Sequence, residues 1–150
     1  MKVTKNQTET YRLTDLNRLD PVTVYVTNYE EGEGRIVIEC YGKAWSQYWG
    51  AMNRTNIQNF IITTDNDYLL DCFIDNTSET DFEKINDMLL AEDLDTSVEN
   101  ITDMWMQSDA MAKAFGEEWP LDIPRKKTAE YLWFNRIVDA IKEAFKNEQQ

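Results

Sequence analysis

The chain has 150 residues, enough for one ordinary domain with a buried core. Hydrophobic residues make up 42% and aromatic residues 12% of it, which excludes a disordered acidic tail, and no stretch reaches the roughly 20 apolar residues of a membrane span. The net charge is −13, and the absence of histidine excludes a Ser-His or Cys-His catalytic pair.

The first part of the chain predicts an antiparallel hairpin preceded by one more strand. Residues 10–14 are a short strand candidate, and residues 22–29 alternate valine with threonine and tyrosine, the period of a strand with one buried face. An EEGEG turn leads to the returning strand, residues 35–42. Beyond it the apolar spacing changes to three and four, which predicts a short helix over residues 44–52.

Helices are predicted for the rest of the chain, and capping residues mark where they start. Asp65 can cap the segment DYLLDCFI, and three capping boxes precede other apolar runs: Thr55 with Gln58, Thr80 with Glu83, and Thr96 with Glu99. A final amphipathic helix is predicted from Thr128 to about Lys146, with the apolar stripe Phe134, Ile137, Val138, Ile141 and Phe145.

Strands followed by helices predict an α+β fold, with a small antiparallel sheet packed against several helices. We expect a single domain over residues 1–150. Its parts are a neutral half that contains the sheet (1–64), an acidic helical segment (65–124) and the C-terminal helix (125–150).

The acidity is concentrated in the middle of the chain. Residues 65–124 hold 17 acidic residues and only Lys84 and Lys113 as bases, whereas residues 1–64 are neutral and residues 125–150 carry a net charge of +2. This distribution should repel duplex nucleic acid, whose binding requires cations, and attract a basic protein surface.

Within this segment nearly every fourth residue is acidic. Nine of ten positions at this spacing carry a carboxylate, where the composition of the segment predicts about three. Like charges four residues apart destabilise a helix by roughly 0.2–0.5 kcal/mol per pair. The repetition of such pairs suggests that binding to a partner offsets this loss of stability. We call these nine residues the acidic row: Asp67, Asp71, Asp75, Glu79, Glu83, Asp87, Asp95, Glu99 and Asp103.

Two interpretations of the acidic row stay open. Carboxylates can be the solvated faces of amphipathic helices, broken into three short rows by the segments around residues 76–78 and 93–95. They can also form a binding surface that imitates a row of phosphates, with Trp105 as a hydrophobic anchor. An EF-hand is excluded, because leucines occupy the positions of calcium ligands after Asp67.

A cluster of aromatic and basic residues gives the alternative hypothesis. Aromatics beside cations can stack the bases of single-stranded nucleic acid, although aromatics at helical spacing are more often part of a core, and Trp, Tyr and Arg are also enriched in protein–protein hot spots. The candidates for nucleic-acid binding are Arg35, Lys43, Trp45, Tyr48 and Trp49.

The segments YRLTDLNRLDPVTVYVTNY, GRIVIECYGKAWSQYWGAM and DNDYLL, within residues 11–70, resemble small accessory proteins of enterobacterial phages and prophages. EYLWFNRIV resembles the end of the same family, and the acidic stretch between them looks like an addition. The resemblance implies a protein that acts in the cytoplasm of a bacterial host, and by analogy with small acidic phage proteins it suggests inhibition of host defence, such as anti-CRISPR activity.

Together these observations predict a non-enzymatic protein that binds a host protein with a basic, nucleic-acid-binding surface. No cofactor, metal or membrane is expected, and Cys40 and Cys72 are expected to be reduced thiols. A carboxylate-metal hydrolase is a third hypothesis, for which the sequence offers no convergent motif.

Overall fold

The computed structural model describes residues 1–150 as two compact units. Unit 1 combines Met1–Thr77 with Ala129–Gln150, and unit 2 is Ser78–Thr128. Unit 2 is therefore an insertion between two parts of unit 1. The α+β class is confirmed, and the expectation of a single domain stays a prediction.

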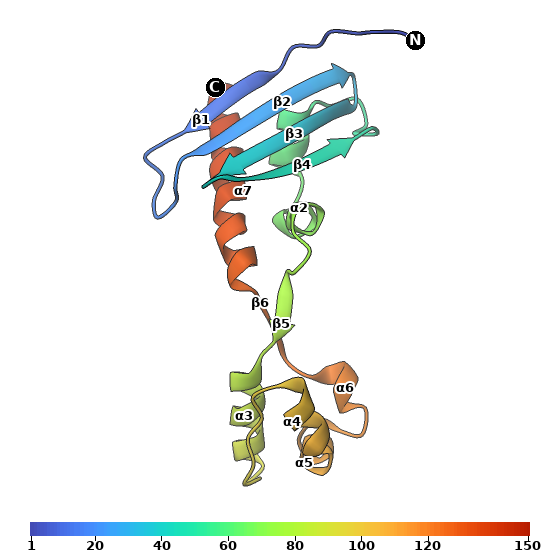
Figure 1. Ribbon diagram of the computed structural model, residues 1–150, viewed down its shortest axis with the longest axis vertical. Helices are drawn as coiled ribbons and strands as arrows, with labels where there is room; N and C mark the ends of the chain where they lie inside the picture. The colour runs from blue at the N-terminus through green and yellow to red at the C-terminus, as the bar shows by residue number, and fades with distance from the viewer. The chain divides into compact units, whose positions relative to one another are not determined.

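Unit 1 is built on a four-stranded antiparallel sheet in the order β1-β2-β3-β4 (Figure 1). The first three strands, β1 (Glu9–Leu13), β2 (Val22–Glu30) and β3 (Glu33–Cys40), occupy the segments in which strands are predicted. The alternation in β2 is confirmed, because its three valines are buried at exposures of 0–1%.

The helix predicted over residues 44–52 is wrong. This segment forms β4 (Lys43–Trp49), which pairs with β3 along its whole length. The apolar spacing predicts a helix here because Trp45 and Trp49 are four residues apart. That separation puts two side chains on one face of a helix and also on one face of a strand.

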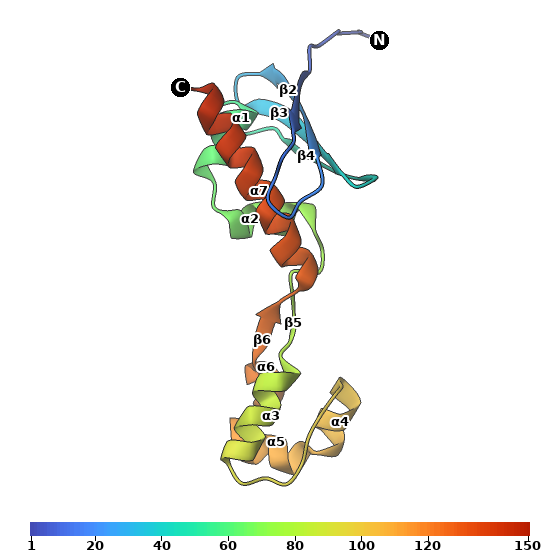
Figure 2. The ribbon, with the colours of Figure 1, turned by 90° about the vertical axis from the view of Figure 1, so that its left-hand side faces the viewer.

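Three helices cover one face of this sheet, as the side view shows (Figure 2). They are α1 (Ile57–Thr63), α2 (Asn66–Phe73) and α7 (Ala129–Glu148). The predicted C-terminal helix is confirmed, and all five residues of its stripe are buried. They pack with the valines and isoleucines of β2 and β3 in one hydrophobic core.

A buried polar network fastens this core near the edge strand β1. Gln58, 7% exposed, donates to Glu9 Oε1 at 3.2 Å and to the Tyr11 hydroxyl at 3.1 Å, and it accepts from Asn28 Nδ2 at 3.0 Å. Tyr11 in turn donates to Glu148 of α7 at 2.8 Å, and burial raises its pKa. The network satisfies the polar atoms of a buried amide, which would otherwise destabilise the fold.

Unit 2 begins and ends with a two-stranded antiparallel ribbon, β5 (Ser78–Thr80) and β6 (Arg125–Lys127). Between the strands lie α3 (Phe82–Ala91), α4 (Ile101–Met106), α5 (Ser108–Phe115) and α6 (Trp119–Asp122). Their core is small: Ile85, Leu89, Val98, Met104, Met111 and Trp119.

Asn86 holds the irregular segment between α3 and α4. Its side-chain amide donates to the carbonyl of Val98 at 2.9 Å and accepts from the amide of Val98 at 2.8 Å. This pair of hydrogen bonds takes the place of a strand partner for Val98, whose side chain is fully buried.

The helix caps agree with the sequence to within a few residues. Asp65 caps α2 as predicted, but α1 and α3 are capped by Asn56 and Asp81, one residue after the predicted threonines. The cap of α4 is Asn100, four residues after Thr96. Asparagine and aspartate are stronger caps than threonine, which explains the shifts.

None of the helices combines the length and the apolar character that crossing a bilayer requires.

Replacement of Phe134 by alanine tests the contact between α7 and the sheet. Phe134 is fully buried, with its ring centroid 4.8 Å from that of Trp45 and 5.4 Å from that of Phe73. We expect Phe134→Ala to lower the free energy of unfolding by about 3–5 kcal/mol in urea denaturation. Leu132→Ala on the same helix is the control, because Leu132 is 57% exposed and should change stability by less than about 1 kcal/mol. Equal losses in both variants would contradict this packing.

Candidate functional site

The acidic row does not lie on one helix. Asp67 and Asp71 are on α2 and Asp75 follows it, all in unit 1, whereas the other six carboxylates belong to unit 2. In unit 2 only Glu83 and Asp87 share a helix, α3. The longest helical stretch of the row thus contains two carboxylates.

Two members of the row have roles inside the protein. Asp67 accepts a hydrogen bond from the hydroxyl of Tyr131, which links α2 to α7. Asp103 accepts from the backbone amide of Glu99 at 3.0 Å, while its own amide donates to Asn100 Oδ1 at 2.8 Å. This reciprocal pair caps α4.

The other seven carboxylates are exposed: Asp71, Asp75, Glu79, Glu83, Asp87, Asp95 and Glu99. The fold does not use these side chains for packing. They are available to a partner, and five of them belong to unit 2.

Unit 2 also exposes five large apolar side chains. Trp105 is 58% exposed on α4, beside Met106 at 77% and one turn after Ile101 at 62%. Leu90 of α3 and Leu121 of α6 are 74% and 82% exposed. Single exposed apolar residues are normal, but Ile101, Trp105 and Met106 lie together on one short helix, and contiguous groups of this kind mark interaction surfaces.

The orientation of Trp105 is fixed by a second indole. Its ring lies 4.8 Å, centroid to centroid, from that of Trp119, which is 3% exposed in the core of unit 2. One side of the Trp105 ring is therefore held in place while more than half of the residue faces solvent. An anchor ordered in advance loses less conformational entropy on binding.

The charge around this apolar group is strongly negative. Unit 2 has 13 acidic and 5 basic residues, a net charge of −8, and three of the bases are in β6. The helices α3 to α6 and their loops thus present carboxylates and apolar side chains with only Lys84 and Lys113 as cations. We call Ile101, Trp105 and Met106, with the exposed carboxylates of unit 2, the unit 2 surface.

The aromatic and basic cluster is divided by the pleat of β4. Trp45 and Trp49 turn inward, where the Trp45 ring lies 5.5 Å from that of Trp133 and the Trp49 ring lies 4.9 Å from that of Phe60. Both tryptophans thus contribute to the packing of the sheet against its helices.

The other three members of the cluster are exposed. The Arg35 guanidinium lies 5.6 Å from the centre of the Tyr48 ring and donates to Ser46 Oγ at 2.9 Å. The Tyr48 hydroxyl donates to Glu33 at 2.9 Å, and this hydrogen bond raises the pKa of Tyr48. Lys43 stands at the start of β4. The face of the sheet away from the helices therefore carries tyrosine and arginine, but no tryptophan.

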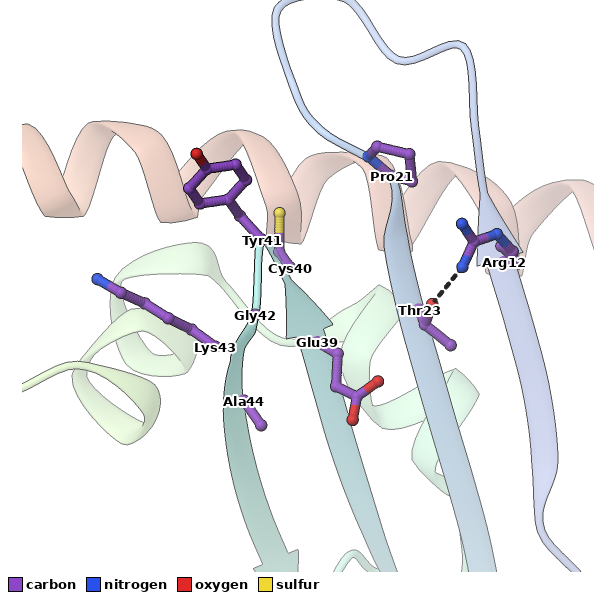
Figure 3. A pocket seen from close by; sticks show the side chains of 9 residues that line it. All are labelled: Arg12, Pro21, Thr23, Glu39, Cys40, Tyr41, Gly42, Lys43 and Ala44. Carbon is purple, nitrogen blue, oxygen red and sulfur yellow. Dashed lines mark hydrogen bonds between the residues drawn. The ribbon is translucent and has the colours of Figure 1, made fainter.

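A pocket lies at the end of the sheet where β3 turns into β4 (Figure 3). Its volume is about 300 Å³, and we call it the Tyr41 pocket. In Figure 3 Arg12 and Lys43 lie on opposite sides of Glu39. The lining residues are Arg12, Pro21, Thr23, Glu39, Cys40, Tyr41, Gly42, Lys43 and Ala44.

The sequence did not reveal two features of these surfaces. The exposure of Ile101 is not predicted, because the capping box at Thr96 predicts an earlier start for its helix, whereas α4 begins only at Ile101. The turn at Tyr41 is not predicted either, because the apolar spacing of the next segment predicts a helix. The sequence does contain a signal for this turn, because a residue followed by glycine between two segments of alternating apolar residues is typical of a tight hairpin.

No three Cys, Asp or Glu residues form a group that could hold a metal ion. Both cysteines are free thiols, Cys40 buried and Cys72 half-buried, and burial raises the pKa of Cys40.

Comparison with known families assigns the chain to a class of proteins. A family model described as a phage family matches residues 1–147, so the chain belongs to this phage protein family. The match includes the acidic segment, which lies mostly outside the resemblance of residues 11–70. No curated protein and no solved structure matches the chain.

The hydrogen bond between Tyr131 and Asp67 predicts how stability depends on pH. The bond raises the pKa of Tyr131 from 10.0 to about 12, so it stabilises the fold fully below pH 10 and is lost as the pH rises towards 12. We expect wild type to be more stable than Tyr131→Phe at pH 8, and this difference to shrink by pH 11.5 in urea denaturation. A difference that stays constant over this range would show that the hydroxyl does not titrate as the contact requires.

Proposed function

We propose that this phage protein acts without catalysis, by binding a bacterial host protein through the unit 2 surface. The partner has a basic surface with an apolar recess that accepts the indole of Trp105. The observation that carries this proposal is the half-exposed, pre-oriented Trp105 within a unit of net charge −8.

Charge and apolar surface have separate roles in this proposal. Exposed carboxylates such as Glu83 and Asp87 raise the rate of encounter with a basic partner and disfavour acidic ones. Desolvation of Trp105 and its neighbours supplies most of the affinity, since tryptophan is among the residues most enriched in interface hot spots. Carboxylates alone would give a weak and salt-sensitive complex.

Inhibition of host defence is the narrower form of the proposal. A partner that uses its basic surface to bind nucleic acid would lose that site to unit 2. Imitation of a continuous phosphate row has less support, because the acidic row is divided among short elements. Competition for a basic site does not need such a row, since it needs only overlap with the surface.

Affinity capture from a bacterial lysate, with and without nuclease treatment, can identify the partner. Four baits should be compared with wild type: Trp105→Ala, the double variant Glu83→Lys with Asp87→Lys, and the matched controls Leu132→Ala and Glu143→Lys on α7. Leu132 and Glu143 are exposed residues of unit 1, so the controls repeat the same kinds of change outside unit 2.

With the purified partner, Trp105→Ala should weaken binding about thirtyfold or more, because truncating a hot-spot residue costs about 2 kcal/mol or more. The double charge reversal should slow association and reduce its dependence on salt. Both controls should bind like wild type in calorimetry and stopped-flow experiments. A partner that binds the Trp105→Ala and charge-reversed proteins as tightly as wild type would refute the proposal.

A further inference from the structure

The two-residue turn between β3 and β4 contains a tyrosine that the fold does not explain. Cys40 pairs with Lys43, so only Tyr41 and Gly42 form the turn, and their φ angles are +50° and +74°. Turns of this kind strongly favour asparagine followed by glycine. A bulky side chain at positive φ is strained, and such residues often occur at functional sites.

Packing does not offset this strain. Tyr41 is 79% exposed, and its ring is in none of the aromatic contacts that organise the core of unit 1. An asparagine would form the same turn with less strain. We therefore look for a role of Tyr41 other than stabilising the fold, and this residue lines a pocket.

The chemistry of the Tyr41 pocket is that of a site for an anion with an aromatic ring. The lining contains two cations, Arg12 and Lys43, and one carboxylate, Glu39, so the pocket has a net charge of +1 in a chain of net charge −13. In Figure 3 Arg12 lies on one side of Glu39, and the Lys43 side chain extends away from Glu39 on the other. Its volume of about 300 Å³ is at the lower end of the range for small-ligand pockets.

Neighbouring side chains hold two of these groups in place. The Glu39 carboxylate accepts from the Tyr25 hydroxyl at 3.1 Å, and Arg12 Nη1 donates to Thr23 Oγ1 at 3.3 Å. Each contact leaves hydrogen-bonding capacity free, since a carboxylate offers about four lone-pair sites and a guanidinium five donors.

We propose that the Tyr41 pocket binds a nucleoside phosphate, either as a free nucleotide or as an unpaired nucleotide of a single strand. The base stacks on the Tyr41 ring, and the phosphate lies against Arg12 or Lys43. Glu39 accepts hydrogen bonds from N–H groups at the edge of the base. Guanine offers two adjacent groups of this kind and is the base that fits best.

This site is independent of the unit 2 surface, because all its residues belong to unit 1. It also differs from the nucleic-acid site predicted from the sequence. Of the five residues predicted there, only Lys43 lines the pocket, while Trp45 and Trp49 serve the core.

The decisive variant is Tyr41→Asn in the full-length protein, because asparagine preserves the turn and removes the ring. Calorimetry with GMP and fluorescence anisotropy with a short, labelled, G-containing single strand serve as the two binding assays, both at low salt. We expect Tyr41→Asn to weaken binding about tenfold or more without lowering the melting temperature. Tyr29→Asn, an exposed tyrosine outside the pocket, is the matched control and should bind like wild type.

Two further variants test the roles of the charged groups. Lys43→Gln should weaken binding and reduce its dependence on salt, and Glu39→Gln should lower the preference for guanine over adenine. Binding of GMP identifies the free nucleotide as the ligand, and binding of the strand alone identifies single-stranded nucleic acid. If wild type binds neither GMP nor the strand, or if Tyr41→Asn binds as tightly as wild type, the proposal is overturned. This outcome does not depend on whether the unit 2 surface binds a host protein.

Discussion

The packing of α7 against the inner face of the four-stranded sheet is the contact on which the rest of the structure depends. It buries the stripe from Phe134 to Phe145 against the valines and isoleucines of β2 and β3. Because α7 comes from the last part of the chain, the chain leaves unit 1 to form unit 2 and then returns to unit 1 to make this contact. The packing of the helices also buries one face of the sheet, so only the opposite face and the turns are accessible to ligands.

Much of unit 1 could be predicted from its sequence, because its signals are local. Alternation marks β2 and β3, and a repeat of three and four marks α7, so the residues that form the core are apparent. The strand β4 could not be recognised in this way. Trp45 and Trp49 satisfy both periods, and pairing with β3, a tertiary contact, decides between them. The same pairing sends the tryptophans inward and leaves Tyr41 and Tyr48 outside.

Unit 2 was harder to predict, because its residues are held by a few side-chain contacts instead of long periodic elements. Its acidity is a property of composition and was apparent from the sequence, but the position of each carboxylate depends on where short helices begin. Asn100 rather than Thr96 caps α4, and this shift places Ile101 in the first turn of the helix, where it is exposed. Asn86 binds the backbone of Val98, a contact that no pattern in the sequence indicates.

The insertion of unit 2 has a consequence for the order in which the protein is made. Synthesis proceeds from the N-terminus, so the whole of unit 2 is complete before α7 exists. Contacts within unit 2 join residues that are near each other in the chain, whereas those between β1 and α7 span nearly its full length and close slowly. During that interval only α1 and α2 are available to cover the valine face of the sheet, and the part that α7 covers stays exposed. The nascent protein is then most vulnerable to aggregation, and a chaperone would find its target there.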